Sequence, residues 1–289
     1  MTTLTAGTTL PATRRTVPLF RLYRAELRWI FRRPRTLVVL GLLAVIPAII
    51  AIALAVGGTP EGPPGEQGGD SLFATAAGNA LVLPIAALTA GLALLLPLVT
   101  AMSAGDAIAG ELAHGTLRGW LLAPVGRGRL LVVKTLGVAT FTLAAVLVMA
   151  VVGVVAGLAM NGTGGLFTLN GTTLSFAAAL GKVALAAGWV TLQLWAVGAV
   201  ALAISACTEH PMLVVVSVLA GTILSTVLLQ LSAVDWLHPF LLPQSWEALV
   251  DVLRDPMPGD MLGQGAIRAS CYVVIGLSLA YARITTRDG

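Results

Sequence analysis

The sequence contains very little charge for its length. Only 10% of its 289 residues are Asp, Glu, Lys or Arg, whereas 57% are hydrophobic; soluble domains carry about 25% charged residues. Several apolar runs of about 20 residues are long enough to cross a bilayer as helices. Short alternating segments, which are typical of membrane β-barrels, are lacking. We therefore predict an all-α polytopic membrane protein.

Cysteine is nearly absent as well. Cys207 and Cys271 fall near or within separate predicted spans, with no spacing typical of a metal site or a disulfide framework. We interpret both as small apolar packing residues. The first 15 residues, MTTLTAGTTLPATRR, contain no apolar core of a cleaved signal peptide, so the first span is predicted to act as its own insertion signal.

Motifs for chemistry are also missing. No G-x-x-x-x-G-K-[ST] phosphate loop occurs, because Gly181-Lys182 is followed by Val183 inside an apolar run. The three histidines are scattered over different loops, and the acids near Asp255 have no spacing of a cation cage. We predict no catalytic, cofactor or metal site on this chain. The predicted spans also hold almost no ionisable groups away from their ends, which argues against a proton- or sodium-driven carrier.

The apolar runs divide the chain into a flexible N-terminus, 1–16, and a single transmembrane domain, 17–289. Six spans are predicted, at about Thr36–Val56, Leu81–Ala104, Leu130–Met160, Val183–Ala206, Met212–Leu231 and Ala266–Ala282. Gly153 and Gly157 in the third span form a weak small-xxx-small packing signal. An extracytoplasmic loop, 232–263, contains SWEALVDVLRDP, in which Ser245 is predicted to cap a short interfacial helix with Trp246 on its apolar face.

Four arginines in residues 17–33 follow one helical stripe, because they recur at spacings of three, four and four. They are Arg21, Arg24, Arg28 and Arg32. We predict an amphipathic helix in the cytoplasmic interface, with these arginines among anionic head groups of membrane lipids. An ordinary extension of the first span is the alternative. Pro34 separates the helix from the span and predicts a sharp bend there.

The segment 105–129 is the most charged interior part of the chain. Gly115 can end the helix that runs through Glu111, and Thr116 can cap a new short helix, which Pro124 stops. One face of this short helix is apolar and suited to docking, and it consists of Leu117, Trp120 and Leu121. Arg127 then marks the water boundary before the next apolar run.

The order of residues in this segment resembles the cytoplasmic segment between the second and third spans of ABC-2 type transporter permeases. The matching positions are Glu111, Gly115-Thr116-Leu117, Leu121-Leu122, Pro124-Val125, Arg127, Leu130-Leu131 and Lys134. The resemblance implies a coupling helix on a separate ABC ATPase subunit that binds ATP and Mg. It also implies a second permease copy or a related permease chain. Importer permeases have a loop that begins Glu-Ala-Ala, and the Glu111-Leu112-Ala113 found here favours an exporter.

The basic residues predict the orientation. By this topology, fourteen of the seventeen Lys and Arg lie before the first span, in residues 105–134 or at the C-terminus. The positive-inside rule puts that side, with both termini, in the cytoplasm, and the ABC-2 resemblance implies a bacterial plasma (inner) membrane. The net charge of +4 is explained by these margins, so no nucleic-acid partner is predicted. A secondary carrier or channel, and a membrane scaffold that does not transport, are the alternatives.

Overall fold

The computed structural model describes residues 18–57, 69–80, 82–113, 126–162, 166, 168 and 171–286. Among these residues 89% are helical and none forms a strand. Six helices in this part of the chain are long and apolar enough to cross a membrane. The predicted all-α polytopic fold is therefore confirmed, whereas the predicted flexible N-terminus, 1–16, lies outside the described residues.

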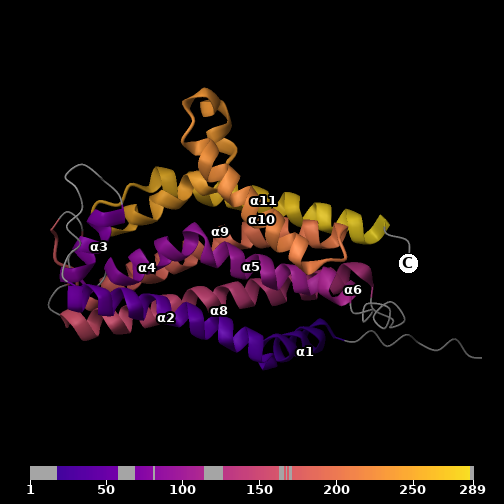
Figure 1. The fold of residues 1–289 in the computed structure, drawn as a ribbon, viewed down its shortest axis with the longest axis horizontal. Coiled ribbons are helices and arrows are strands. Elements are labelled where there is room, and N and C mark those ends of the chain that lie inside the picture. Colours follow the sequence, from indigo (N-terminus) through magenta and orange to yellow (C-terminus); the bar gives the residue numbers. More distant parts are fainter. Residues whose placement is uncertain are drawn as a thin grey trace, which may run out of the picture.

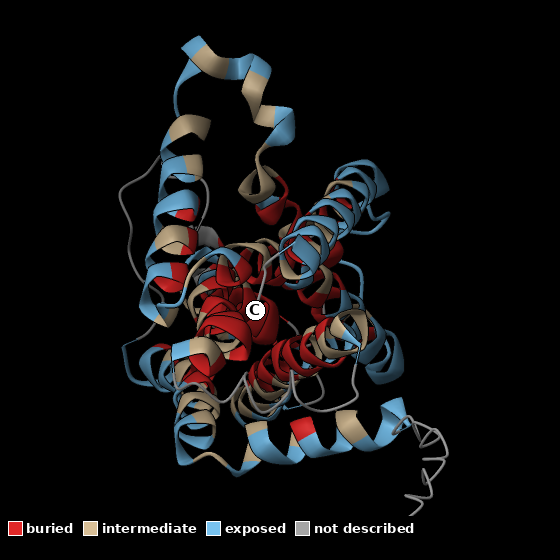
Figure 2. Ribbon diagram, turned by 90° about the vertical axis from the view of Figure 1, so that its right-hand side faces the viewer, coloured by how far each residue is buried: buried red, intermediate tan, exposed pale blue. Residues whose placement is uncertain are grey.

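The helices run along one long bundle (Figure 1). The spanning elements are α2 (Pro34–Gly57), α5 (Leu95–Gly105) with its continuation, α8 (Arg127–Asn161), α9 (Phe176–Cys207), α10 (Pro211–Leu229) and α11 (Gly259–Thr286). The remaining elements are α1 (Leu19–Arg32), α3 (Gly69–Gly78), α4 (Val82–Ala93), η1 (Asp106–Gly110), α6 (Glu111–Ala113), η2 (Ser232–Phe240) and η3 (Leu242–Leu253). Buried residues gather in the middle of the bundle, and the outer helices expose one side (Figure 2).

Elements that are distant in sequence meet at the two ends of the bundle. The end that carries α1 and α6 also holds the C-terminal end of α11, and α3 lies at the opposite end (Figure 1). The first element, α1, ends at Arg32 because Arg33 is extended, with ψ 125°, as expected for a residue before proline. The bend predicted at Pro34 is confirmed, since α2 begins at that residue.

The second span consists of successive helical pieces. Leu94, with φ −148° and ψ −48°, separates α4 from α5. Pro84 and Pro97 lie in the first turns of α4 and α5, where a missing N–H breaks no intrahelical hydrogen bond. Beyond the predicted end at Ala104, the helix continues through η1 and α6 to Ala113. Almost every residue of α4 is buried, so this short helix forms the centre of the bundle.

Glycines allow the closest helix contacts. A Cβ atom added at Gly153 would lie 2.7 Å from Pro84 Cα, and Gly157 lies against Ala80. The start of the second span, at Ala80 and Pro84, therefore packs directly on the small-xxx-small pair of α8. On the other side of the bundle, a Cβ atom at Gly276 of α11 would lie 2.7 Å from the carbonyl carbon of Ala199 of α9.

Three local expectations are wrong. Ser245 does not cap a helix, because η3 begins at Leu242 and the Ser245 hydroxyl inside it donates to the Leu242 carbonyl at 3.3 Å. The face around Trp246 is buried against α4, α9, α10 and α11, so η3 is inserted into the bundle. Cys207 and Cys271 are both exposed and are not packing residues of the core.

The contact at Gly276 gives a direct test of the packing. Gly276→Ala should lower the free energy of unfolding by about 1 to 3 kcal/mol, because the new methyl group overlaps the Ala199 backbone. Gly263→Ala is the matched control, since a Cβ at this other α11 glycine has no atom within 4 Å. The control should be neutral or stabilising because alanine favours helix. Equilibrium unfolding in mixed micelles measures both, and equal effects would contradict the contact.

Candidate functional site

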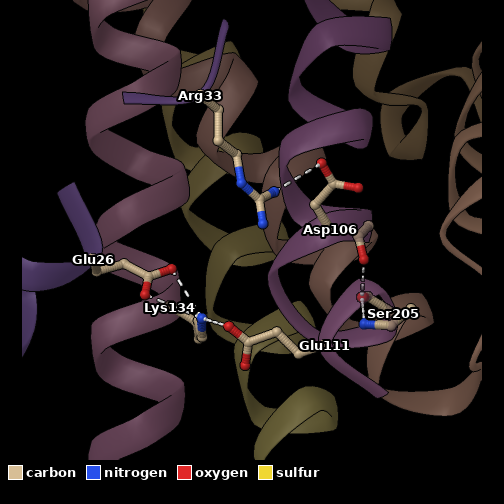
Figure 3. Close-up of polar contacts among 8 residues, drawn as sticks. Glu26, Arg33, Asp106, Glu111, Lys134 and Ser205 are labelled. Atoms are coloured by element: carbon tan, nitrogen blue, oxygen red, sulfur yellow. Dashed lines mark hydrogen bonds and ion pairs between the residues drawn. The ribbon is translucent and has the colours of Figure 1, made fainter. Parts of the chain in front are cut away.

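A buried lysine joins two carboxylates at the α1 and α6 end of the bundle (Figure 3). The Lys134 Nζ atom in α8 donates to Glu26 Oε1 at 2.9 Å and to Oε2 at 3.1 Å, and it also forms an ion pair with Glu111 of α6. Lys134, Glu26 and Glu111 are only 2%, 6% and 7% exposed. We call these residues the Lys134 triad. Charges buried this deeply require such partners, because desolvation alone costs several kcal/mol for each ion.

The sequence of α1 and α8 explains why Glu26 reaches this position. A Cβ atom at Gly137 would lie 3.0 Å from Ile30 Cδ1 and 3.1 Å from Glu26 Cγ, so a larger residue would require these side chains to shift, and glycine favours this approach of α1. One turn further, the Tyr23 hydroxyl and Thr140 Oγ1 are 2.6 Å apart. Glu26 therefore lies on the packed face of α1, and α1 is fixed to α8 along its length.

A second group of charges lies beside the triad. Asp106, at the start of η1, pairs with Arg35 and lies 3.9 Å from Arg33. The Arg33 guanidinium stacks 3.1 Å above the Trp29 ring. Burial and the neighbouring Arg35 lower the pKa of Arg33, while the carboxylates of Glu111 and Glu26 act in the opposite direction. These contacts hold the bend between α1 and α2 against the second span.

Between Asp106 and Glu111 the backbone forms a π-helix, which is often found at functional sites. Ser205 of α9 fills the irregular turn, since its Oγ accepts from the Ala109 N–H at 3.0 Å and donates to the Gly105 carbonyl at 3.3 Å. A Cβ at Gly105 would lie 3.0 Å from the Pro211 carbonyl oxygen at the start of α10. The end of the second span is therefore bound to α8, α9 and α10.

A cavity of about 40 Å³ adjoins both charged groups and is lined by residues of α1, α2, α5, η1 and α8 that include Glu26, Asp106 and Lys134. Its volume is enough for one or a few water molecules. Within the described residues, no group of three or more His, Cys, Asp or Glu is arranged to hold a metal ion. The site is suited to positioning helices by charge.

Two of the eight predicted coupling residues lie on either side of the segment 114–125, whose residues the structure does not describe. Glu111 belongs to the Lys134 triad. Arg127 begins α8 and donates to the carbonyl oxygens of Ile284 at 3.3 Å and Thr285 at 3.0 Å, near the end of α11. The other six lie outside the described residues, and they are Gly115, Thr116, Leu117, Trp120, Leu121 and Pro124.

The predicted arginine stripe is exposed along α1. Arg21, Arg24, Arg28 and Arg32 are all exposed, and together with Trp29 and Pro34 they line an open surface groove of about 760 Å³. The arginines therefore lie on the side of α1 away from Glu26. Contact with lipid stays a prediction.

Sequence reasoning missed the partners of the triad. No sequence pattern indicated a role for Glu26, and Lys134, near the start of the third predicted span, entered only through the family resemblance; both side chains are buried. One signal was available in each case. Lys134 follows the apolar Leu130–Val133, where an ionisable residue needs a partner, and Glu26 is the only acid between Arg21 and Arg35.

The fold defines a multi-pass membrane protein, and its buried ion pairs lie at one end of the bundle. The family profile for ABC-2 family transporter proteins matches residues 21–265 of the chain, and this range includes most of α1, both carboxylates of the triad and Lys134. The chain belongs to the ABC-2 transporter family. No curated protein matches it.

Removing the lysine should destabilise the protein more than removing one of its partners. Lys134→Met leaves two buried carboxylates without their ammonium partner and should cost about 3 to 5 kcal/mol of unfolding free energy. Glu26→Gln should cost less, because Lys134 still pairs with Glu111. The combined Glu26→Gln, Lys134→Met and Glu111→Gln variant should recover much of the loss. Equal unfolding midpoints for Lys134→Met and Glu26→Gln would contradict this assignment.

Proposed function

We propose that the chain is the permease subunit of an ABC exporter that is driven by separate ATPase subunits. Two copies, or one copy with a related permease chain, enclose the path, because one half of a gate cannot. ATP and Mg are bound by the partner, and this chain hydrolyses nothing itself. The complex lies in the bacterial inner membrane with both termini in the cytoplasm.

The observation that carries this proposal is the position of the Lys134 triad around the segment 114–125. Glu111 precedes that segment by three residues and Lys134 follows it by nine, so their ion pair connects its two flanks. A partner that displaces the segment must therefore exert force on α6 and α8 together. The Lys134–Glu26 contact transmits this force to α1, and the hydrogen bond between Ala109 and Ser205 transmits it to α9. A contact that differs between two states of the partner is what coupling requires.

The arginine stripe supports the orientation. In the proposed topology Arg21, Arg24, Arg28 and Arg32 face the head groups of the cytoplasmic leaflet, where each basic residue contributes about 1 kcal/mol. Held by lipid on one face and by Glu26 on the other, α1 serves as a lateral support for the moving end of α8.

One observation favours the alternative of a secondary carrier: Lys134 and its two carboxylate partners are buried in the bundle. The adjoining cavity of about 40 Å³ accommodates only a few water molecules, which is too little for an organic substrate. The charges also lie at the end of the bundle, about 10 Å from the start of α8 at about 1.5 Å per residue. This position favours coupling to a partner over a carrier's central site.

The docking face gives the main test. Trp120→Ala combined with Leu117→Ala should leave the chain inserted and folded but abolish capture of the ATPase, because a buried aromatic anchor contributes upwards of about 2 kcal/mol. Pull-down of the partner and the ATPase rate in reconstituted vesicles measure the effect. The permease alone should show no ATP turnover.

The matched control is Trp236→Ala, which removes an aromatic side chain that is 73% exposed on η2. This change should leave ATPase capture and the ATPase rate intact. Normal capture and stimulation by the double variant would refute the assignment of the segment 105–129 as the coupling element.

The orientation is tested by fusing a periplasm-active reporter enzyme after single positions. A fusion after Cys207, at the end of α9, should be inactive, and one after Asp255, between η3 and α11, should be active. Lys182 near the start of α9 donates to the Arg254 carbonyl oxygen at 2.8 Å, so the two positions mark opposite ends of that helix. A fusion after Gly65, which lies outside the described residues, should also be active. Activity after Cys207 would reverse the topology.

A further inference from the structure

Two adjoining surface cavities form one apolar groove between α8 and α11. Their volumes are about 300 and 410 Å³, and both are lined by Thr135, Leu136 and Leu277. We call this the α8–α11 groove. It exists because α11 packs closely on α9, with Gly276 against Ala199, and leaves α8 further away.

The groove has the depth of one membrane leaflet. Its lining on α8 runs from Leu131 to Leu143, about 18 Å at about 1.5 Å per residue, whereas half of a hydrocarbon core is about 15 Å. The α8 side chains along it are open, since Val132, Leu136 and Leu143 are 46%, 44% and 38% exposed. An acyl chain matches this length and this apolar surface.

A tryptophan lies at the deep end. Trp195 is the lining residue of α9 that is furthest from Cys207, and its indole N–H donates to the Ala139 carbonyl oxygen of α8, another lining residue, at 3.2 Å. Tryptophan usually lies at the membrane interface. Trp195 instead lies about 18 Å from Cys207, the last residue of α9, at about 1.5 Å per residue. This side chain is fixed by a hydrogen bond across the groove and limits how deep a chain can enter.

The other end of the groove is positively charged. Arg127 and Arg129 lie in the first turn of α8, which has no acidic residue, and Arg283 lies in the last turn of α11. The dipole of α8 adds to this charge. The Tyr281 ring marks the mouth, because a Cβ at Gly128 would lie 3.3 Å from its Cε2 atom. The apolar groove therefore ends at the charge that a phosphate group needs.

We propose that the α8–α11 groove binds one acyl chain of an anionic phospholipid, with its phosphate group beside Arg127 and Arg129. The lipid comes from the leaflet on the side of the bundle where α8 begins. Lipid binding at this site needs no ATPase, so it is tested on the permease alone.

The experiment uses the full chain in phosphatidylcholine vesicles that contain a rising fraction of phosphatidylglycerol brominated on its acyl chains. The difference in quenching between the wild type and Trp195→Phe reports contact at Trp195. Half of this quenching should need an about fivefold lower mole fraction of brominated phosphatidylglycerol than of brominated phosphatidylcholine, the factor expected from one basic residue near the surface.

Two variants separate the ends of the groove. Arg129→Gln should remove the preference for phosphatidylglycerol but keep quenching by both lipids. Thr135→Phe fills the part that both cavities share and should reduce the Trp195 quenching, whereas Val151→Phe, at an α8 side chain 57% exposed outside the groove, should not. If Thr135→Phe fails to fold, the comparison of the two head groups and the Arg129→Gln variant still show whether the groove prefers an anionic lipid.

Two results would overturn the proposal. Quenching that follows mole fraction equally for both head groups would mean an ordinary annular lipid. No quenching at any fraction would mean that a second copy of the chain covers this face.

Discussion

A single ammonium group, Lys134 Nζ, determines how one end of this protein is assembled. Buried in an apolar bundle, it is stable only with negative partners. Glu26 and Glu111, which lie 108 and 23 residues earlier in the sequence, provide them. Their pairing brings α1 onto α8 and closes α6 against α8. Two local features fit this pairing. Gly137 leaves room for Glu26 and Ile30 of α1 beside α8, and the π-helix at Asp106–Gly110 directly precedes Glu111.

A buried ion pair contributes little net stability, since the desolvation penalty offsets the attraction. Here the ion pairs of Lys134 instead fix the relative positions of α1, α6 and α8. A hydrophobic contact at the same place would tolerate sliding, whereas Lys134 can satisfy both carboxylates only in a narrow range of α1, α6 and α8 positions. The adjoining Asp106 group adds a second point of reference at the bend between α1 and α2. The end of the bundle next to the segment 114–125 is therefore its most closely defined part.

The spans were predictable because bilayer crossing depends on average apolarity over about 20 residues, and a single Lys134 barely changes that average. For the same reason hydropathy could not reveal the triad, whose partners Glu26 and Lys134 are 108 residues apart. The stripe on α1 was evident from its period, but its opposite face was recognisable only once α8 was in place. Ser245 failed as a cap because Pro243 favours an earlier helix start, and the burial of η3 depends on a cavity between four helices that no local pattern describes.

The packing also divides the bundle into two parts that differ in how firmly they are joined. Gly276 binds α11 to α9 along a close contact, and Gly153, Gly157 and the triad bind α8 to α4, α6 and α1. Between these parts, α8 and α11 are joined near Arg127 by hydrogen bonds to the end of α11, and the groove separates them further along. A force on the segment before α8 therefore acts near the end where α8 and α11 are hydrogen-bonded. The width of the groove, and with it the room for an acyl chain, must change whenever α8 turns against α9 and α11.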